Sequence, residues 1–401
     1  MENHLKEIKL AKERIKNVIK KTPLIYSELF SKLSSNEVYI KPENLQKTGA
    51  FKIRGAYNKL TQLTEEEKSK GLVASSAGNH AQGVAYAAKE LGVKATIVMP
   101  KNTPFIKVDS TRGYGAEVVL HGSCYDEAYE KALEIEKDKG ATFIHPFNDM
   151  DVIYGQGTIG LEILEELKDA DALLVPIGGG GLISGISLAI KSINPKIRVI
   201  GVEPEGATTL KTSLMNGKVT ELEKVQTIAD GVAVKKCGDK TYDIIKDYVD
   251  DIITVSDYEL MNAFLKLLEK HKLVCEHAGV LTLAATTKLN FYNKKVVSVV
   301  SGGNIDVVTI SSMINNGLVS SGRLFCFSAE MPDVPGELLK ISEVLKYLNA
   351  NVIKLEHNQF KALNRIHNVV LEVTVETHGY DHIERIKNKL NEVGYDIRQI
   401  Y

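Results

Sequence analysis

The chain has 401 residues, a formal net charge of −1 and 25% charged residues, which excludes a strongly basic surface for nucleic acid or acidic lipid. Hydrophobic residues make up 44%, enough for a large core, and the length predicts roughly two to three domains. Four scattered cysteines form no Cys-x-x-Cys pair, which argues against a disulfide framework or a zinc site. We therefore expect a cytoplasmic protein with no nucleic-acid partner.

One uncharged run, residues 172–190, has the length of a membrane span. It contains Pro176 and five glycines, four of them consecutive, which would break a spanning helix near its middle. The N-terminus is amphipathic and lacks the apolar core of a signal peptide. We interpret the run as a buried strand, a loop and a helix, and expect no membrane partner.

The predicted elements begin with an amphipathic helix over residues 5–20 and a strand over Glu37–Lys41. From residue 72 onward, short β-branched strands alternate with helices. The expected strands are 72–75, 94–99, 116–120, 142–146, 172–177, 198–202 and 295–300, and the expected helices are 79–91, 103–112, 125–137, 157–167, 182–193, 258–270 and 279–288. Residues 204–255 are less regular. The alternation predicts an α/β fold with open, twisted, mostly parallel sheets and helices on both faces.

The pattern changes near residue 318. The last part predicts strands at 324–329, 351–360, 367–377 and 396–400, and helices at 336–348 and 380–393. This βαββαβ order is typical of an α+β, ferredoxin-like domain, with a four-stranded antiparallel sheet and two helices on one face. We therefore expect two domains, 1–320 and 321–401, the first with two α/β subdomains of which the smaller, about 50–150, is inserted.

Lys52 directly follows an aromatic residue, between Gly49 and Gly55 and just before an apolar helical pattern. A lysine at a strand-to-helix junction can be desolvated, which favours the neutral, nucleophilic amine that a Schiff base requires. With 50 lysines and arginines in the chain, a solvated charge on a helix turn is the ordinary alternative. The interpretation of Lys52 therefore depends on finding the rest of a cofactor site.

Four consecutive glycines, Gly178–Gly181, follow a predicted strand and open a helix. Backbone N–H groups can crowd around an anion there, and the helix N-terminus adds favourable partial charge, so the loop predicts a phosphate site. The alternative is a flexible tight turn. No Gly-Lys-Ser/Thr follows, and only Glu203 could serve as a ribose hook, so a nucleotide or dinucleotide site is not favoured.

Two further turns carry polar groups at strand ends. Ser75–His80 leads into a helix whose N-terminus could bind a carboxylate, while the Asn79 amide could bond a ring hydroxyl; the alternative is an ordinary N-cap. Ser301–Asn304 follows the last strand of the first domain, and its alternative is an ordinary β-to-α turn. We expect these turns, Lys52 and the glycine loop to lie at one edge of the predicted sheet, where ligands bind in α/β proteins.

A Schiff-base lysine, a phosphate cradle, a carboxylate nest and a further hydroxyl are what pyridoxal 5′-phosphate (PLP) requires. The sequence resembles the fold-type II (tryptophan synthase β-like) family of PLP enzymes, and within it the threonine dehydratases. The motifs Phe-Lys-Ile-Arg-Gly-Ala, Ser-Ala-Gly-Asn-His, Gly-Gly-Gly-Gly and Ser-Gly-Gly-Asn recur there in this order, over essentially the whole chain.

The resemblance implies that Lys52 forms the Schiff base and shuttles protons. The implied cofactor-binding residues are Phe51, Lys52, Asn79, Gly178, Gly179, Gly180, Gly181, Leu182 and Ser301, and the implied substrate-binding residues are Ser76, Ala77, Gly78, Asn79 and His80. The implied reaction converts L-threonine to 2-oxobutanoate and ammonia, and L-serine to pyruvate, in isoleucine synthesis or in catabolism. The family also suggests a tetramer or a dimer.

Two other functions are open. A serine or threonine racemase of this family carries a serine as second proton donor where this chain has Ala77, so racemisation lacks its partner. A non-catalytic small-molecule sensor would keep the phosphate pocket but would not need a buried amine at position 52.

The chain departs from the family at two places. Glu203, Ala207 and Thr209 match a divalent-cation site only in part, because its acidic third ligand is missing, and we expect no metal. The segment after Glu276 lacks the proline that is common in the family, which leaves the role of Glu276 open.

The C-terminal domain resembles ACT regulatory domains at Asp333–Gly336, which implies an amino-acid or nucleotide effector. A purely structural dimerisation domain is the alternative.

Overall fold

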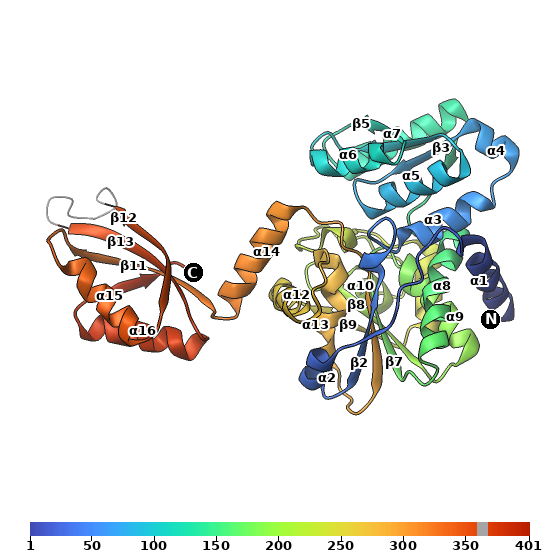
Figure 1. Cartoon of the computed structure of the whole chain (residues 1–401). Helices are drawn as coiled ribbons and strands as arrows, with labels where there is room; N and C mark the ends of the chain where they lie inside the picture. Colours follow the sequence, from blue (N-terminus) through green and yellow to red (C-terminus); the bar gives the residue numbers. More distant parts are fainter. Residues whose placement is uncertain (359–367) are drawn as a thin grey trace. The chain divides into compact units, whose positions relative to one another are not determined.

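The computed structural model describes residues 1–358 and 368–401. The chain divides into two compact units, Met1–Asp306 and Val307–Tyr401 (Figure 1). Helix α14 (Val307–Ser320) belongs to the second unit, where it packs against strand β11 (Leu324–Pro332). The boundary predicted at residue 320 assigns this helix to the first domain, whereas the structure groups it with the second.

The larger sheet of the first unit has six strands in the order β1-β2-β10-β7-β8-β9. Their bounds are β1 Ile25–Tyr26, β2 Glu37–Pro42, β7 Ala172–Pro176, β8 Arg198–Pro204, β9 Asp251–Val255 and β10 Lys295–Val300. All neighbours are parallel except β1 and β2. Strand β7 is buried along its whole length, as expected for an apolar strand inside a parallel sheet.

Helices cover this sheet. They are α1 Glu2–Ile15, α2 Glu28–Ser34, α8 Met150–Glu166, α9 Gly181–Ile193, α10 Thr209–Met215, α11 Asp239–Tyr248, α12 Asp257–His271 and α13 Leu281–Ala285. Helices α1, α8 and α9 lie side by side (Figure 1). A Cβ added to Gly157 of α8 would stand 2.7 Å from the Gly185 carbonyl of α9, so glycine allows this close crossing. Helix α8 starts earlier than the predicted 157 because Asp149 caps it, accepting from the N–H groups of Asp151 and Val152.

A second, wholly parallel sheet has the order β5-β4-β3-β6. Its strands are β3 Leu72–Ser75, β4 Ala95–Met99, β5 Glu117–Leu120 and β6 Thr142–Phe143, and its helices are α5 Asn79–Leu91, α6 Phe105–Gly113 and α7 Tyr125–Lys139. The prediction that all site segments meet at the edge of one sheet is wrong, because β3, which precedes Ser76–His80, belongs to this second sheet. The alternation of strands and helices does not show which strands are hydrogen-bonded to one another, and so it does not reveal that there are two sheets.

Along the chain, helix α3 (Lys52–Thr61) follows β2 of the larger sheet and precedes β3 of the second sheet. It packs against α5 and α8. It is preceded by the 3-10 turn η1 (Glu43–Leu45) and followed by α4 (Glu65–Lys70). The stretch 204–255, predicted to be irregular, contains α10, the 3-10 turn η2 (Asp230–Val232), α11 and β9. Two more 3-10 turns, η3 (His277–Val280) and η4 (Thr286–Lys288), flank α13.

The second unit contains an antiparallel sheet of order β12-β13-β11-β14 with helices α15 (Glu337–Tyr347) and α16 (Tyr380–Glu392). The remaining strands are β12 Asn351–Asn358, β13 Asn368–Glu376 and β14 Ile397–Gln399. Alternate residues of β11 and β13 are buried against both helices, so the helices cover one face, as predicted. Phe360 and His367, predicted strand ends, lie outside the described residues. No helix within 1–358 and 368–401 has the length and apolar character of a membrane span.

Candidate active site

The segment that carries Lys52 is attached to the end of β10 through its backbone. Ala50 forms a β-bridge with Gly302, and the Phe51 N–H donates to the Ser301 carbonyl at 3.1 Å. The N–H of Gly303 donates to the Gly49 carbonyl at 2.8 Å. The sequence predicts Lys52 at a strand-to-helix junction. In the structure it does not follow a strand directly, because η1 and a turn lie between β2 and α3. The backbone contacts nevertheless bring the start of α3 next to Ser301.

The Lys52 amine lies in a desolvated environment. Its Nζ donates to the Pro146 carbonyl at 3.0 Å and stands 5.2 Å from the centre of the Phe51 ring. Burial lowers the pKa of Lys52 from 10.5 to about 8, an effect that the Glu276 carboxylate partly opposes. Roughly a tenth of the amine is therefore neutral at pH 7, far more than for an ordinary lysine, and the neutral form is the one that a nucleophile or a proton acceptor requires.

Asn79 is the centre of a polar network beside Lys52. Its Nδ2 donates to Glu276 Oε1 at 2.6 Å, and its Oδ1 accepts from Asn304 Nδ2 at 2.8 Å. Asn304 also donates to the Thr48 carbonyl at 2.8 Å, which ties the network to the Lys52 segment. Because an amide nitrogen carries two hydrogens, Asn79 keeps one donor for a further acceptor.

Glu276 is the buried carboxylate of this network. Burial, followed by the charge of Asp230, raises its pKa to about 7, although the Asn79 bond and the cations Lys107 and Lys52 lower it. A Cβ added to Gly302 would lie only 2.4 Å from Glu276 Oε1, so the carboxylate sits directly against the turn that follows β10. Glu276 can therefore change protonation state near neutral pH.

The turn from β3 to α5 leaves backbone donors free. The Ser76 N–H is bonded to a carbonyl of β4, and the Gly78 N–H donates to Ser76 Oγ at 3.2 Å. Within the described chain we find no protein acceptor for the N–H groups of Ala77, Asn79 and His80. These donors, at the N-terminus of α5, fit a carboxylate.

The His80 side chain is not suited to bind a carboxylate. Its Nε2 donates to the Ile144 carbonyl at 2.8 Å, and burial, together with the charge of Lys52, lowers its pKa to about 3. The imidazole is therefore neutral, and only the His80 backbone suits an anion.

The glycine loop is closely backed by protein atoms. A Cβ at Gly178 would stand 3.0 Å from Val232, and one at Gly179 or Gly181 would stand 2.3 or 2.9 Å from Phe147. Gly180 has a φ of +93°, which favours glycine. With side chains excluded, the loop can present its N–H groups, and with those of α9 they fit a phosphate. Leu182, in the first turn of α9, is buried in the core.

A buried ion cluster holds the opposite side of α3. Arg54 donates to Glu43 at 2.8 Å and to Glu162 at 2.6 Å, and Lys41 donates to Glu162 at 2.7 Å. All four side chains are at most 3% exposed. Burial alone would raise the pKa of Glu43, but the Arg54 guanidinium outweighs it and holds this pKa below its ordinary value. The cluster joins β2, η1, α3 and α8 behind Lys52.

Glu203 caps a helix through both of its carboxylate oxygens. Its two carboxylate oxygens accept from the N–H groups of Leu210 and Lys211, at 2.8 and 3.0 Å, and so cap α10. Burial raises its pKa to about 7. Among the described residues, no group of three or more His, Cys, Asp or Glu side chains could hold a metal ion.

Sequence reasoning missed several contributors to the site. The sequence predicts Pro146 at a strand end, whereas its carbonyl contacts the Lys52 amine, and it marks Asn304 only as part of a turn motif. Arg54 could have been suspected, because an arginine in an apolar helical face needs buried partners. A single carbonyl contact leaves no signal in the sequence.

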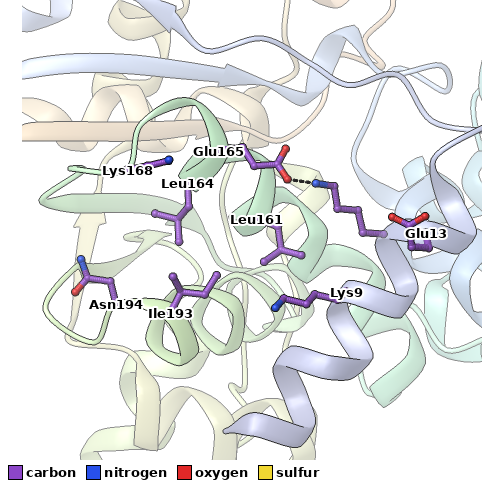
Figure 2. Close-up of a pocket in the computed structure, with 9 residues that line it drawn as sticks. Lys9, Glu13, Leu161, Leu164, Glu165, Lys168, Ile193 and Asn194 are labelled. Atoms are coloured by element: carbon purple, nitrogen blue, oxygen red, sulfur yellow. Dashed lines mark hydrogen bonds and ion pairs between the residues drawn. The ribbon is translucent and has the colours of Figure 1, made fainter.

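A surface groove of about 720 Å³ lies between α1, α8 and α9. Figure 2 shows its lining: Lys9, Lys12, Glu13, Leu161, Leu164, Glu165, Lys168, Ile193 and Asn194. Lys12 of this lining forms an ion pair with Glu165. None of the predicted site residues lines this groove, so we do not associate it with the chemistry.

The donor set at the Lys52 site fits PLP. A desolvated amine suits an aldehyde, the glycine loop suits a phosphate because a Cβ has no room there, and the second Asn79 hydrogen suits a ring hydroxyl. Ser301, which is 4% exposed, is brought to Lys52 by the backbone contacts of Phe51.

Comparison with known proteins agrees with this fit. Residues 15–302 match the family model described as pyridoxal-phosphate dependent enzyme. The chain is 49% identical over 395 residues to an L-threonine ammonia-lyase of Thermotoga maritima, with 98% of each chain covered.

Two solved structures resemble it. One is the processed form of threonine deaminase isoform 2 from Solanum lycopersicum, with TM-score 0.76, 38% identity and coverage of 78% of this chain and 92% of that one. The other is maize serine racemase, with TM-score 0.74, 38% identity and coverage of 79% and 98%. With a desolvated lysine, a glycine cradle and a family match over most of its length, the chain belongs to the pyridoxal-phosphate dependent enzymes.

Proposed function

We propose that this protein is a threonine ammonia-lyase that converts L-threonine to 2-oxobutanoate and ammonia, and L-serine to pyruvate and ammonia. The observation that carries the proposal is the Lys52 amine, whose pKa is lowered to about 8 next to the Asn79–Glu276 pair. The name of the Thermotoga maritima relative, 49% identical along almost the whole chain, supports threonine as substrate.

When bound, PLP supplies an electron sink that makes the substrate Cα–H acidic. The residues that would hold it are Phe51, Lys52, Asn79, Gly178, Gly179, Gly180, Gly181, Leu182 and Ser301. Ser301 would offer a hydroxyl to the ring nitrogen, and a hydroxyl would not keep that nitrogen protonated as a carboxylate would. With a hydroxyl rather than a carboxylate at position 301, loss of the β-hydroxyl would be favoured over other reactions at Cα.

Lys52 would act as the base in this reaction. Its Nζ takes the proton from Cα, which a pKa near 8 allows at neutral pH. The free N–H groups of Ala77, Asn79 and His80 hold the substrate carboxylate and so orient the Cα–H bond. The β-hydroxyl leaves as water and one water is taken up when ammonia is released, so threonine yields 2-oxobutanoate and ammonia in balance.

The first test compares Lys52→Ala with Lys47→Ala, a control at an exposed lysine of the same segment. We expect Lys52→Ala to lose covalent PLP attachment and to reduce ammonia release by at least about a hundredfold, because base and attachment point are both removed. Lys47→Ala should retain both. Wild-type protein that binds PLP but releases no ammonia from threonine or serine would instead be a sensor.

Racemisation is the second candidate function, favoured by the likeness to maize serine racemase. Ala77 offers no hydroxyl as a second proton donor, so we expect little D-serine or D-threonine. Ala77→Ser should raise the ratio of D-isomer to oxo acid, measured by chiral chromatography of the products. An unchanged ratio would show that position 77 does not decide between the two reactions.

We also infer that the second unit is an ACT regulatory domain that binds an amino-acid or nucleotide effector. The βαββαβ order and the turn Asp333–Gly336 before α15 support this. The proposal includes a homo-oligomer, a tetramer or a dimer, in the cytoplasm, that serves isoleucine synthesis or threonine catabolism.

Threonine turnover of the full-length protein should respond to such an effector. Turnover is measured with isoleucine, valine and adenine nucleotides added one at a time, and light scattering reports the oligomer. A response lost on substitution of Asp333–Gly336, with basal turnover kept, would support regulation. Turnover indifferent to every effector would leave a structural dimerisation domain.

A further inference from the structure

The glycine loop has a side-chain support that no sequence motif marks. Thr241, in the first turn of α11, is fully buried, and its Oγ1 lies 2.8 Å from the Gly179 carbonyl and 3.0 Å from the Gly238 carbonyl. The same oxygen accepts the Gly238 N–H at 3.1 Å. A hydroxyl has one hydrogen to donate, and the shorter contact is the one to Gly179.

The contact sets the orientation of one peptide group. The described chain has no cis peptide bond, so the Gly179–Gly180 peptide is trans and its C=O and N–H point in opposite directions. Because the carbonyl faces Thr241, the Gly180 N–H is turned to the other side of the loop. Glycines flank this peptide on both sides, so little in the loop itself prevents it from rotating.

We propose that Thr241 is a positioning residue for the cofactor phosphate: its hydroxyl holds the Gly179 carbonyl and keeps the Gly180 N–H directed at the phosphate. Thr241 itself does not touch the cofactor. Its side chain also packs against the loop, since a Cβ at Gly180 would stand 2.9 Å from Thr241 Cβ. The inference rests on the proposed binding of PLP phosphate at Gly178–Leu182.

The experiment measures the affinity of apoprotein for PLP and for pyridoxal, which lacks the phosphate. Thr241→Val removes the hydroxyl, and Thr241→Ser retains it. Thr286→Val is the matched control, because Thr286 is equally buried and donates to the Leu283 carbonyl at 2.7 Å. The phosphorus NMR shift of bound PLP reports the surroundings of the phosphate directly.

We expect Thr241→Val to weaken PLP binding by roughly 2- to 12-fold, the usual value of one hydrogen bond, and to move the phosphorus signal. Thr241→Ser should recover most of the affinity, and Thr286→Val should change neither quantity. Pyridoxal binding should be the same in all variants. If Thr241→Val does not fold by its urea transition, Thr241→Ala is the second hydroxyl deletion.

Two results would overturn the inference: unchanged PLP affinity in the hydroxyl deletions, or an equal loss for PLP and pyridoxal. The second would mean that Thr241 supports the fold in general and not the phosphate. Wild-type protein that does not prefer PLP to pyridoxal would contradict the phosphate site itself, and so the proposed function.

Discussion

The two ends of the candidate site are built from different groups. At the Lys52 end the site is formed by side chains. They are a lysine amine, the Asn79–Glu276 pair and, behind α3, four buried charged groups around Arg54. At the glycine loop the site is formed by backbone groups, and side chains such as Phe147 only fill the space behind the loop. The difference teaches that a glycine loop able to hold a phosphate is visible in the sequence, whereas a buried polar network depends on partners far apart in the chain.

The largest effect is expected at the Lys52 end, on replacing Arg54 by methionine. Glu43 and Glu162 would stay buried with Lys41 as the remaining cation of the cluster, and breaking such a cluster costs about 3–5 kcal/mol of unfolding free energy. Urea unfolding measures the loss. Lys131→Ala, which breaks a solvent-screened pair with Glu134, is the control and should cost far less. Equal losses in both variants would contradict the role of burial.

The glycine loop should be sensitive to volume. Gly179→Ala places a Cβ 2.3 Å from the Phe147 ring, and such overpacking typically costs about 1–3 kcal/mol. We expect weaker PLP binding, measured by titration of the apoprotein, because the loop must shift. Gly113→Ala is the control, since no atom lies within 4 Å of its Cβ position. If neither substitution weakens PLP binding, the glycine loop is not tightly packed against Phe147.

Protonation distinguishes the two ends further. Only the neutral Lys52 amine attacks an aldehyde, so the rate of PLP attachment to apoprotein should rise with pH, with a midpoint near pH 8, and level off above it. Glu276 raises the pKa of Lys52, so Glu276→Gln should move the midpoint of this profile to lower pH. Stopped-flow absorbance records the rate. A midpoint that moves upward in Glu276→Gln would contradict the electrostatic coupling.

The smallest effect is expected for an ion pair between α6, a helix of the second sheet, and η2, a turn that lies near Glu276. Lys107 of α6 pairs with Asp230 of η2 at 3.1 Å, and the neighbouring Gly231 lies against Glu276. Lys107→Asp or Asp230→Lys should raise the KM for threonine by roughly two- to fivefold, the value of an exposed pair, and the double exchange should restore it. High salt should remove the difference between wild type and variants. No rescue in the double variant would mean that the pair is incidental.

Much of the architecture follows from the sequence alone. Strands β3 and β10 and helix α5 have the predicted bounds, because apolar β-branched runs and a strong helical pattern are local properties. The mostly parallel α/β class and the antiparallel C-terminal sheet are confirmed for the same reason. The roles proposed for Lys52 and the four glycines also rest on local properties, since amine nucleophilicity and conformational freedom belong to the residues themselves.

Tertiary structure alone decided how these pieces meet. It decided the division of the strands into two sheets and the Asn79–Glu276 contact. It also decided the docking of Phe51 on Ser301, two residues 250 positions apart. Desolvation, which lowers the pKa of Lys52 and raises that of Glu276, is likewise a property of the surroundings. Local sequence sets which groups are present, and long-range packing sets which of them share a dry space.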